Sequence, residues 1–224
     1  MADESQNGRP LGGVAPRGFR LADVPPQPWK NGGGVTREIA CWPPGAGLDD
    51  FLWRISVARI DAGGPFSRFP DVDRVIMLLD GPGVVLRGDI ATGMHALTQP
   101  LAPYAFPGDV GIDCILQGGM SQDLNVMSRR RRTRASLTVL RDGAALPTAS
   151  CGMLLAVEST WRVASDEGGD HVLSPSAGLW WAQAPRGWDV RPEGTGPVAD
   201  GAGLVAVAIE ILPSSDGAHM RDAT

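Results

Sequence analysis

The apolar residues of this chain recur with a period of two in short runs. Residues 51–60 are the clearest case, because one face of an extended strand there would carry Phe51, Trp53, Ile55 and Val57. No segment of about 11 residues or more shows an amphipathic helical pattern. With 30 Gly and 19 Pro among 224 residues to supply turns, the pattern predicts an all-β barrel or sandwich.

The opposite face of the same strand would carry Leu52, Arg54, Ser56 and Ala58. Arg54 and Ser56 would lie about 7 Å apart, at the two-residue spacing of a strand. Two interpretations of this face stay open: it meets water, or it forms a polar patch inside the mouth of a barrel.

A second strand is predicted over Arg74–Leu79, whose almost wholly apolar run is typical of burial on both faces. The turn Asp80-Gly81-Pro82-Gly83 follows, and Val84–Arg87 returns. The three segments together predict a β-hairpin.

The strand pattern divides near Gln117–Met120 and then renews, although no clean internal repeat is visible. We expect a disordered N-terminal tail over residues 1–17, one barrel over residues 18–120 and a second over residues 121–213. Residues 214–224 are polar and are expected to form a disordered tail.

Composition restricts the functional classes. The net charge of −5 argues against nucleic-acid binding, because phosphate contacts supply most of that affinity. The run Arg129–Arg132 with Arg134 is interpreted as a solvated turn, with an interaction patch as the alternative. The three cysteines lack CxxC spacing, which indicates neither a zinc site nor a disulfide framework and suits a reducing compartment. No apolar run reaches the ~18 residues of a membrane span and no signal peptide is evident, so we expect no membrane association and a cytoplasmic location.

The loop Trp29–Gly34 (WKNGGG) precedes another alternating segment, Val35–Trp42. Its three glycines allow a sharp turn or a close backbone approach. Trp29 would then be an apolar wall of a pocket, and the Asn31 amide would both donate and accept hydrogen bonds. An ordinary turn with a buried Trp is the alternative; a phosphate-binding loop is less consistent with the sequence, since neither glycine-rich phosphate motif is present.

The segment from Gly63 to Gly81 resembles the first motif of a metal-binding cupin barrel, in which two histidines and a glutamate hold the metal. With the closing glycine at Gly81, the histidine positions fall on Ser67 and Phe69, and the glutamate position falls on Arg74. A guanidinium would repel a metal ion but can bind a carboxylate through two parallel hydrogen bonds. We therefore expect a barrel without metal or other cofactor whose pocket takes an anion.

Five segments, in this order, resemble the HutD/Ves family of the cupin superfamily: WKNGGGVTREI from Trp29, WRISVA from Trp53, GPFS from Gly64, Asp73-Arg74, and DLNVM from Asp123. The resemblance is strong over residues 19–135 and general from there to Leu212. It implies a bicupin, two cupin-like β-barrels or jelly rolls packed together, and a homodimer. It also implies a regulatory or accessory role in histidine utilisation, by binding a metabolite such as N-formyl-glutamate, or a role in stress response.

N-formyl-glutamate carries two carboxylates and a formamide, and the candidate site provides complementary groups. Arg54 and Arg74 would each take a carboxylate, and amide or hydroxyl groups would meet the formamide. Asp123 would orient an arginine, since like charges repel at short range. The full set of candidate ligand-binding residues is Trp29, Asn31, Gly32, Arg54, Ser56, Phe66, Arg74, Asp123 and Asn125. The alternative is that Arg54–Asp123 and Arg74–Asp73 are structural ion pairs.

A non-catalytic protein that binds a small dicarboxylate fits the sequence best. The alternative is a cupin enzyme, an isomerase or hydrolase acting on a small acidic metabolite, with Asp123 or His95 as acid or base. No base and nucleophile stand at a recognisable spacing to support it. A third interpretation makes the arginine run Arg129–Arg134 a docking site for a partner protein or nucleic acid.

Overall fold

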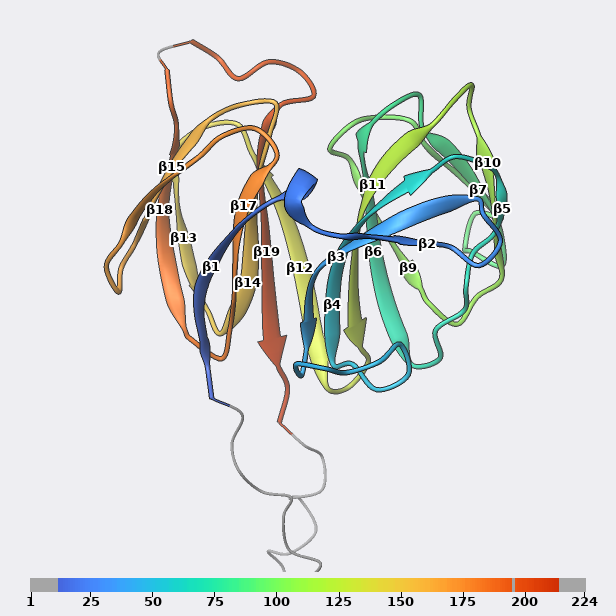
Figure 1. The fold of residues 1–224 in the computed structure, drawn as a ribbon, viewed down its shortest axis with the longest axis horizontal. Helices are drawn as coiled ribbons and strands as arrows, with labels where there is room; N and C mark the ends of the chain where they lie inside the picture. The colour runs from blue at the N-terminus through green and yellow to red at the C-terminus, as the bar shows by residue number, and fades with distance from the viewer. Residues whose placement is uncertain (1–11, 195, 214–224) are drawn as a thin grey trace, which may run out of the picture.

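The structure is a computed structural model that describes residues 12–194 and 196–213, and its strands form four antiparallel sheets (Figure 1). The first inner sheet has the order β2-β3-β4-β11-β6-β9, and the first outer sheet has the order β5-β10-β7-β8. The second inner sheet has the order β1-β17-β14-β19-β12, and the second outer sheet has the order β13-β18-β15-β16. A short 3-10 helix, Leu21–Asp23, follows β1.

The bounds of the strands are as follows. The first inner sheet contains β2 (Pro26–Pro28), β3 (Gly34–Trp42), β4 (Trp53–Ile60), β6 (Val72–Asp80), β9 (Pro103–Pro107) and β11 (Ser121–Arg129), and the first outer sheet contains β5 (Gly64–Pro65), β7 (Val84–Gly88), β8 (Met94–Leu97) and β10 (Ile112–Leu116). The second inner sheet contains β1 (Val14–Arg20), β12 (Thr133–Leu140), β14 (Cys151–Val157), β17 (Ala177–Ala182) and β19 (Gly203–Ile211), and the second outer sheet contains β13 (Ala144–Ala149), β15 (Trp161–Ser165), β16 (Asp170–Leu173) and β18 (Arg186–Pro192).

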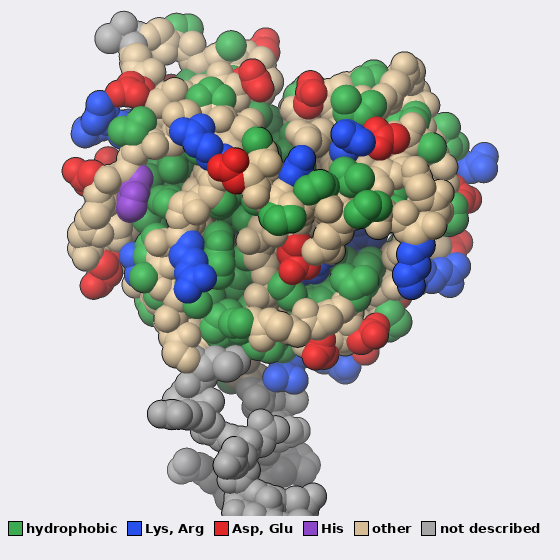
Figure 2. Space-filling model, viewed as in Figure 1, with side chains coloured by type: hydrophobic (Ala, Val, Ile, Leu, Met, Phe, Trp, Pro, Cys, Tyr) green, Lys and Arg blue, Asp and Glu red, His purple; other side chains and the backbone are tan. Residues whose placement is uncertain are grey.

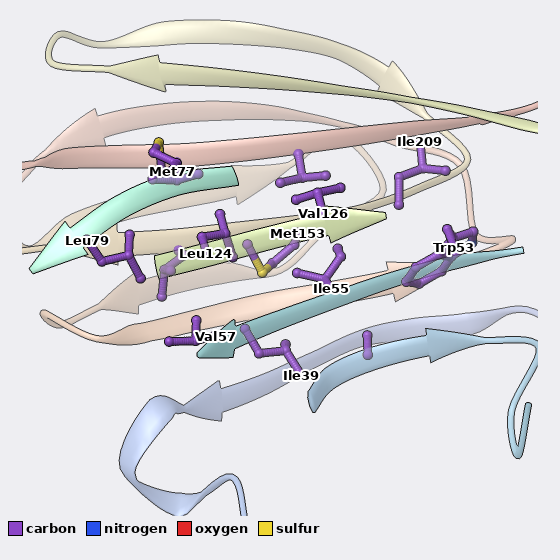
Figure 3. Packing of buried hydrophobic residues seen from close by; sticks show 14 of the residues in the cluster. Ile39, Trp53, Ile55, Val57, Met77, Leu79, Leu124, Val126, Met153 and Ile209 are labelled. Atoms are coloured by element: carbon purple, nitrogen blue, oxygen red, sulfur yellow. The ribbon is translucent and has the colours of Figure 1, made fainter. Parts of the chain in front are cut away.

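Among the described residues, three large apolar cores hold the sheets together, and a smaller fourth cluster contains Phe51, Val72 and Met127. One fills the first jelly roll, between its inner and outer sheets, and includes Ile76, Leu86 and Phe106. A second fills the second jelly roll around Trp161 and Trp188. The third lies between the two inner sheets, where side chains of the first inner sheet meet those of the second, among them Trp53, Ile55, Val57, Met77, Leu124, Val126, Met153 and Ile209 (Figure 3). The all-β prediction is confirmed, with each half built as paired jelly-roll sheets rather than one closed barrel.

Strand β4 is buried on both faces, which decides the open question about Arg54 and Ser56. Trp53, Ile55 and Val57 enter the core between the inner sheets. The alternate residues therefore point into the first jelly roll, and Arg54 and Ser56 are only 8% and 2% exposed. This face is an interior polar patch and does not meet bulk water.

The chain crosses between the two halves at both ends of the first jelly roll, which differs from the boundaries expected from the sequence. Strand β11 pairs with β4 and β6, so residues 121–129 belong to the first jelly roll rather than the second. Strand β1 pairs with β17 in the second half, so residues 14–17 are a strand and not part of a tail. The remainder of the predicted tails, residues 1–11 and 214–224, lies outside the described residues.

The predicted hairpin over residues 74–87 is also wrong. Strand β6 pairs with β11 and β9 in the inner sheet, whereas β7 pairs with β10 and β8 in the outer sheet. Gly81 and Gly83 adopt φ values of +91° and +88°, which redirect the chain from one sheet to the other. The Gly83 amide donates to Ser121 Oγ at 2.9 Å and fixes this crossing.

No helix in the described part of the chain has the length and apolar character needed to cross a membrane.

Candidate functional site

Three neighbouring strands bring five of the predicted site residues to one face of the first inner sheet. Met127 of β11 lies between Arg54 of β4 and Arg74 of β6. In the next inward-facing row, Asn125 lies opposite Ser56 on one side and Ile76 on the other. Asp123 occupies the row beyond, opposite Ala58 and Leu78. All of these positions follow from the two-residue period of the strands.

Arg74 is a buried cation surrounded by aromatic rings. Its side chain belongs to a residue only 5% exposed. The guanidinium carbon lies 5.0 Å from the centre of the Phe106 ring, 5.4 Å from Phe66 and 5.6 Å from Phe69. Such contacts favour a guanidinium by cation–π attraction. Within the described residues no carboxylate lies within 4.0 Å of it, and its one hydrogen bond runs from Nε to Asn125 Oδ1 at 3.5 Å.

Burial lowers the pKa of Arg74 to about 10, with the charge of Arg54 acting in the same direction and that of Asp123 opposing it. The guanidinium therefore keeps its positive charge at neutral pH. A buried charge without a counterion is costly, and the site favours an anion beside Arg74 for this reason.

Arg54 is different, because its charge is already compensated. Its Nε donates to Glu38 Oε2 at 2.6 Å. Its Nη1 faces Ser56 Oγ at 3.5 Å and Met127 Sδ at 4.0 Å. Since Glu38 already neutralises Arg54, Arg74 is the stronger candidate of the two to receive a carboxylate.

Neither ion pair considered as a purely structural role for the arginines is formed among the described residues. Arg54 pairs with Glu38 rather than Asp123. Asp73 pairs with Arg130 at 2.8 Å rather than with Arg74. Asp73 and Arg74 are consecutive in an extended strand, so their side chains point to opposite faces.

Asp123 is a buried carboxylic acid with an unsatisfied oxygen. The residue is 2% exposed, and Oδ1 has no hydrogen-bond partner among the described residues. Burial raises its pKa to about 7, with Arg74 acting in the opposite direction. It does not orient an arginine as expected, because no arginine nitrogen in the described chain lies within 4.0 Å of its carboxylate.

The loop Trp29–Gly34 is a tight turn at the surface. Asn31 Oδ1 accepts a hydrogen bond from the Gly33 amide at 3.0 Å, and Gly32 has a φ of +70°. The Trp29 indole donates to Thr36 Oγ1 at 2.8 Å and packs against the core of the first jelly roll. Asn31 and Gly32 are exposed, so these two candidate residues do not share the inward-facing rows of Arg74 and Asn125.

Glu38, Phe69 and Phe106 contact the two arginines but were not among the candidate site residues. The alternation of residues 35–42 places Glu38 on one face of its strand, but the Arg54 contact depends on the register with β4 and on a bulge between Glu38 and Ala40. Phe106 reaches Arg74 because β9 pairs with β6. Both contacts are between neighbouring strands, and a single sequence does not specify which strands pair.

The residues at the cupin metal positions do not fit a metal ion. Phe69 packs over the Arg74 guanidinium, so a ring and a cation occupy two of the three positions. Among the described residues no group of three or more His, Cys, Asp or Glu is placed to hold a metal.

Figure 2 shows basic side chains partly covered by hydrophobic ones in the half of the surface that covers the first jelly roll.

The arginine run lies at the turn between β11 and β12 and cross-links neighbouring loops. Arg129 donates to the carbonyl oxygens of Asp49, Phe51 and Pro70 at 2.7, 3.2 and 3.2 Å. Arg130 donates to carboxylates on two other segments, at 2.9 Å each. These two side chains are engaged within the fold, which favours the interpretation of a turn over that of a docking patch.

Comparison with known proteins agrees with the family resemblance of the sequence motifs. Residues 21–199 match the family described as HutD. Protein Ves of Citrobacter koseri is 37% identical over 167 residues, which cover 73% of this chain and 81% of that protein. A conserved protein of unknown function from Pseudomonas aeruginosa superposes with a TM-score of 0.76 at 31% identity, covering 88% of this chain and 99% of that one.

HutD from Pseudomonas fluorescens superposes with a TM-score of 0.71 at 28% identity, covering 89% of this chain and all of that one (100%). Protein Ylba from E. coli shares the fold alone, with a TM-score of 0.65 at 7% identity. These likenesses confirm the cupin-type fold that the motifs implied. With its family signature, its relatives and its paired jelly rolls in agreement, the chain belongs to the HutD family.

Proposed function

We propose that this protein binds a small organic dicarboxylate, such as N-formyl-glutamate, inside its first jelly roll. In this proposal the protein acts without catalysis, as a regulatory or accessory protein of histidine utilisation or of a stress response. The observation that carries the proposal is Arg74, a buried guanidinium with three phenylalanine rings around it and no carboxylate within 4.0 Å among the described residues.

A carboxylate is the anion that best suits this guanidinium. Its two oxygens match the planar fork of an arginine and accept two parallel hydrogen bonds. Among the described residues the Arg74 side chain donates only from Nε, to Asn125, so its two terminal nitrogens are left to a guest. Phosphate would also suit a guanidinium, but the apolar surroundings favour the smaller charge of a carboxylate.

The remainder of the guest would extend along the inward-facing rows of the sheet. Asn125 offers an amide beside Arg74, and Ser56 lies directly opposite Asn125. Both groups can hydrogen-bond an amide or a second carboxylate. Arg54 would stay paired with Glu38 and would act on this end of the guest through its contact with Ser56.

A second candidate function, an isomerase or hydrolase acting on the same class of metabolite, is favoured by one observation. Asp123 has a pKa raised to about 7, which suits a general acid or base at neutral pH. His95, the other candidate base, lies in β8 of the outer sheet and stacks on Tyr104 of β9, with ring centres 3.6 Å apart. Turnover of N-formyl-glutamate by the purified protein would establish this function in place of the first.

Calorimetric titration with N-formyl-glutamate tests the proposal. The wild-type protein should bind it, and Arg74→Gln should abolish binding while Arg59→Gln leaves it unchanged. Arg59 is the matched control because it is an exposed arginine on the same sheet, paired with Asp61. Arg74→Lys keeps the charge but not the fork, so it should weaken binding without eliminating it. No binding of any dicarboxylate at millimolar concentration would refute the proposal.

The homodimer implied by the family resemblance and the cytoplasmic location expected from the sequence are parts of the same proposal. Light scattering coupled to size-exclusion chromatography measures the first directly. A mass of one chain, 23.5 kDa, would contradict it.

A further inference from the structure

Asp123 is a buried acid that the proposed site does not yet use. It projects from β11 on the same face as Asn125. The amide oxygen of Asn125 accepts a hydrogen bond from Arg74 Nε. The contact at Asn125 turns the Arg74 side chain along the sheet toward the row of Asp123. Asp123 and Arg74 are nevertheless more than 4.0 Å apart, since no ion pair joins them.

We propose that Asp123 enters the complex as a neutral carboxylic acid, so that the site takes up one proton when it binds its anionic guest. The protonated oxygen donates a hydrogen bond to an acceptor on the guest, and the guest's carboxylate lies on Arg74. The ligand class is thereby an acid with a second acceptor, and not an amino acid with a free ammonium group. This inference rests on the function proposed above.

The surroundings of Asp123 support the neutral form. Oδ1 is buried and receives no hydrogen bond from the described residues, so an ionised carboxylate there lacks the donors that would stabilise it. Its cross-strand neighbours are Ala58 of β4 and Leu78 of β6, which provide no donor from their side chains.

Among the described residues, the titratable groups whose charges interact with Asp123 are Arg74 and Cys114, and the pair Arg54–Glu38 lies on the same sheet. Arg74 of β6 opposes its protonation but does not contact it. Cys114 of β10 is near enough for the charge of Asp123 to add to the effect of burial, and the thiol has a pKa raised to about 12, so it stays neutral. Arg54 of β4 and Glu38 of β3 form a closed pair. None of these groups delivers a second positive charge to Asp123.

An anionic guest favours the neutral form of Asp123 further. A carboxylate on Arg74 cancels the one charge that favours ionisation of Asp123, and a second acidic group on the guest adds repulsion. The carboxyl groups of N-formyl-glutamate stay ionised above about pH 6. Protons taken up on binding between pH 7 and pH 8.5 therefore come to the protein, and its affinity must fall as the pH rises.

Titration calorimetry in two buffers of different ionisation enthalpy measures the proton uptake directly. For N-formyl-glutamate and wild-type protein, we expect uptake that approaches one proton per guest at pH 8. We also expect affinity to fall by about tenfold between pH 7.5 and pH 8.5, the slope of one linked proton. Asp123→Asn should bind with no proton uptake and no dependence on pH in this range. The control Asp113→Asn changes an exposed carboxylate on β10 and should behave as wild type.

L-Glutamate in the same experiment distinguishes the two chemistries. If it binds more tightly than N-formyl-glutamate and gains affinity with rising pH, an ionised Asp123 accepts the ammonium group and the inference is wrong. Binding of N-formyl-glutamate that needs Arg74 but shows no proton uptake would overturn the inference and leave the proposed function standing. No binding of either compound at any pH would overturn both. The wild-type measurements decide the question even if Asp123→Asn fails to fold.

Discussion

Asp123 makes a quantitative prediction about the stability of the free protein. Its pKa is raised from an ordinary value of 3.8 to about 7 in the fold. The folded state therefore holds the proton more tightly than the unfolded chain, and the resulting stability is complete below about pH 4. This stability is lost as the pH rises toward 7, where the folded protein must also ionise the group. At about 1.4 kcal/mol per pKa unit, the full loss is about 4 kcal/mol.

Asp123→Asn removes the ionisable group and keeps the shape of the side chain. We expect the variant to gain stability relative to wild type as the pH rises, from less than about 1 kcal/mol at pH 4 to about 4 kcal/mol at pH 8. For a chain of this size the gain at pH 8 corresponds to a rise in the unfolding temperature of about 10 °C. Urea unfolding of both proteins at pH 4, 6 and 8 measures the difference.

The control Asp113→Asn replaces an exposed carboxylate on β10. It should change stability by less than about 0.5 kcal/mol at every pH. If the stability difference between Asp123→Asn and wild type stays constant from pH 4 to pH 8, the pKa of Asp123 is not raised by folding, because the carboxyl group then titrates alike in the folded and unfolded states.

Three further substitutions test individual contacts of the structure. Glu38→Gln removes the carboxylate beside the buried Arg54 and should destabilise the protein by about 2 kcal/mol in urea unfolding; a cost as small as that expected for the exposed Asp61→Asn, under about 0.5 kcal/mol, would show that the pair is not structural. Arg129→Ala deletes three hydrogen bonds to carbonyl oxygens and should cost about 2 kcal/mol in the same assay, whereas an unchanged unfolding midpoint would make the turn merely solvated. Gly178→Ala places a methyl group against the Leu154 carbonyl and 2.5 Å from the Phe19 ring, so amide exchange across residues 14–20 should accelerate as β1 separates from β17; unchanged protection there would contradict the pairing.

The strand alternation of the first jelly roll was sufficient to predict which residues share a face, although not that this face lies in the interior. A period of two places Arg54 with Ser56, and Asp123 with Asn125, on single faces of their strands, and the structure has both. The motif comparison placed Arg74 where a cupin would have a metal ligand, and it lies in the interior, as a ligand position would. These inferences needed no knowledge of which strands pair.

The errors arose where distant pairing decided the outcome. The Asp80–Gly83 turn is compatible with a hairpin, yet β6 pairs instead with β11, whose first residue lies some 40 positions along the chain. Strand β1 pairs with β17 near the other end of the chain. The counterion of Arg54 depended in the same way on the register between β3 and β4. Local propensity carries no information on such choices, which come from burial of whole strand faces.

A crystal structure of the protein with N-formyl-glutamate bound tests the proposed site at Arg74 most directly. We expect a guest carboxylate about 3 Å from the terminal nitrogens of Arg74, with the phenylalanine rings around it and Asn125 beside it. The pair Arg54–Glu38 should remain closed. A guest bound elsewhere with no carboxylate on Arg74, for instance in the cavity of about 100 Å³ that Ser136, Leu146 and Trp181 line in the second jelly roll, would overturn the proposed site.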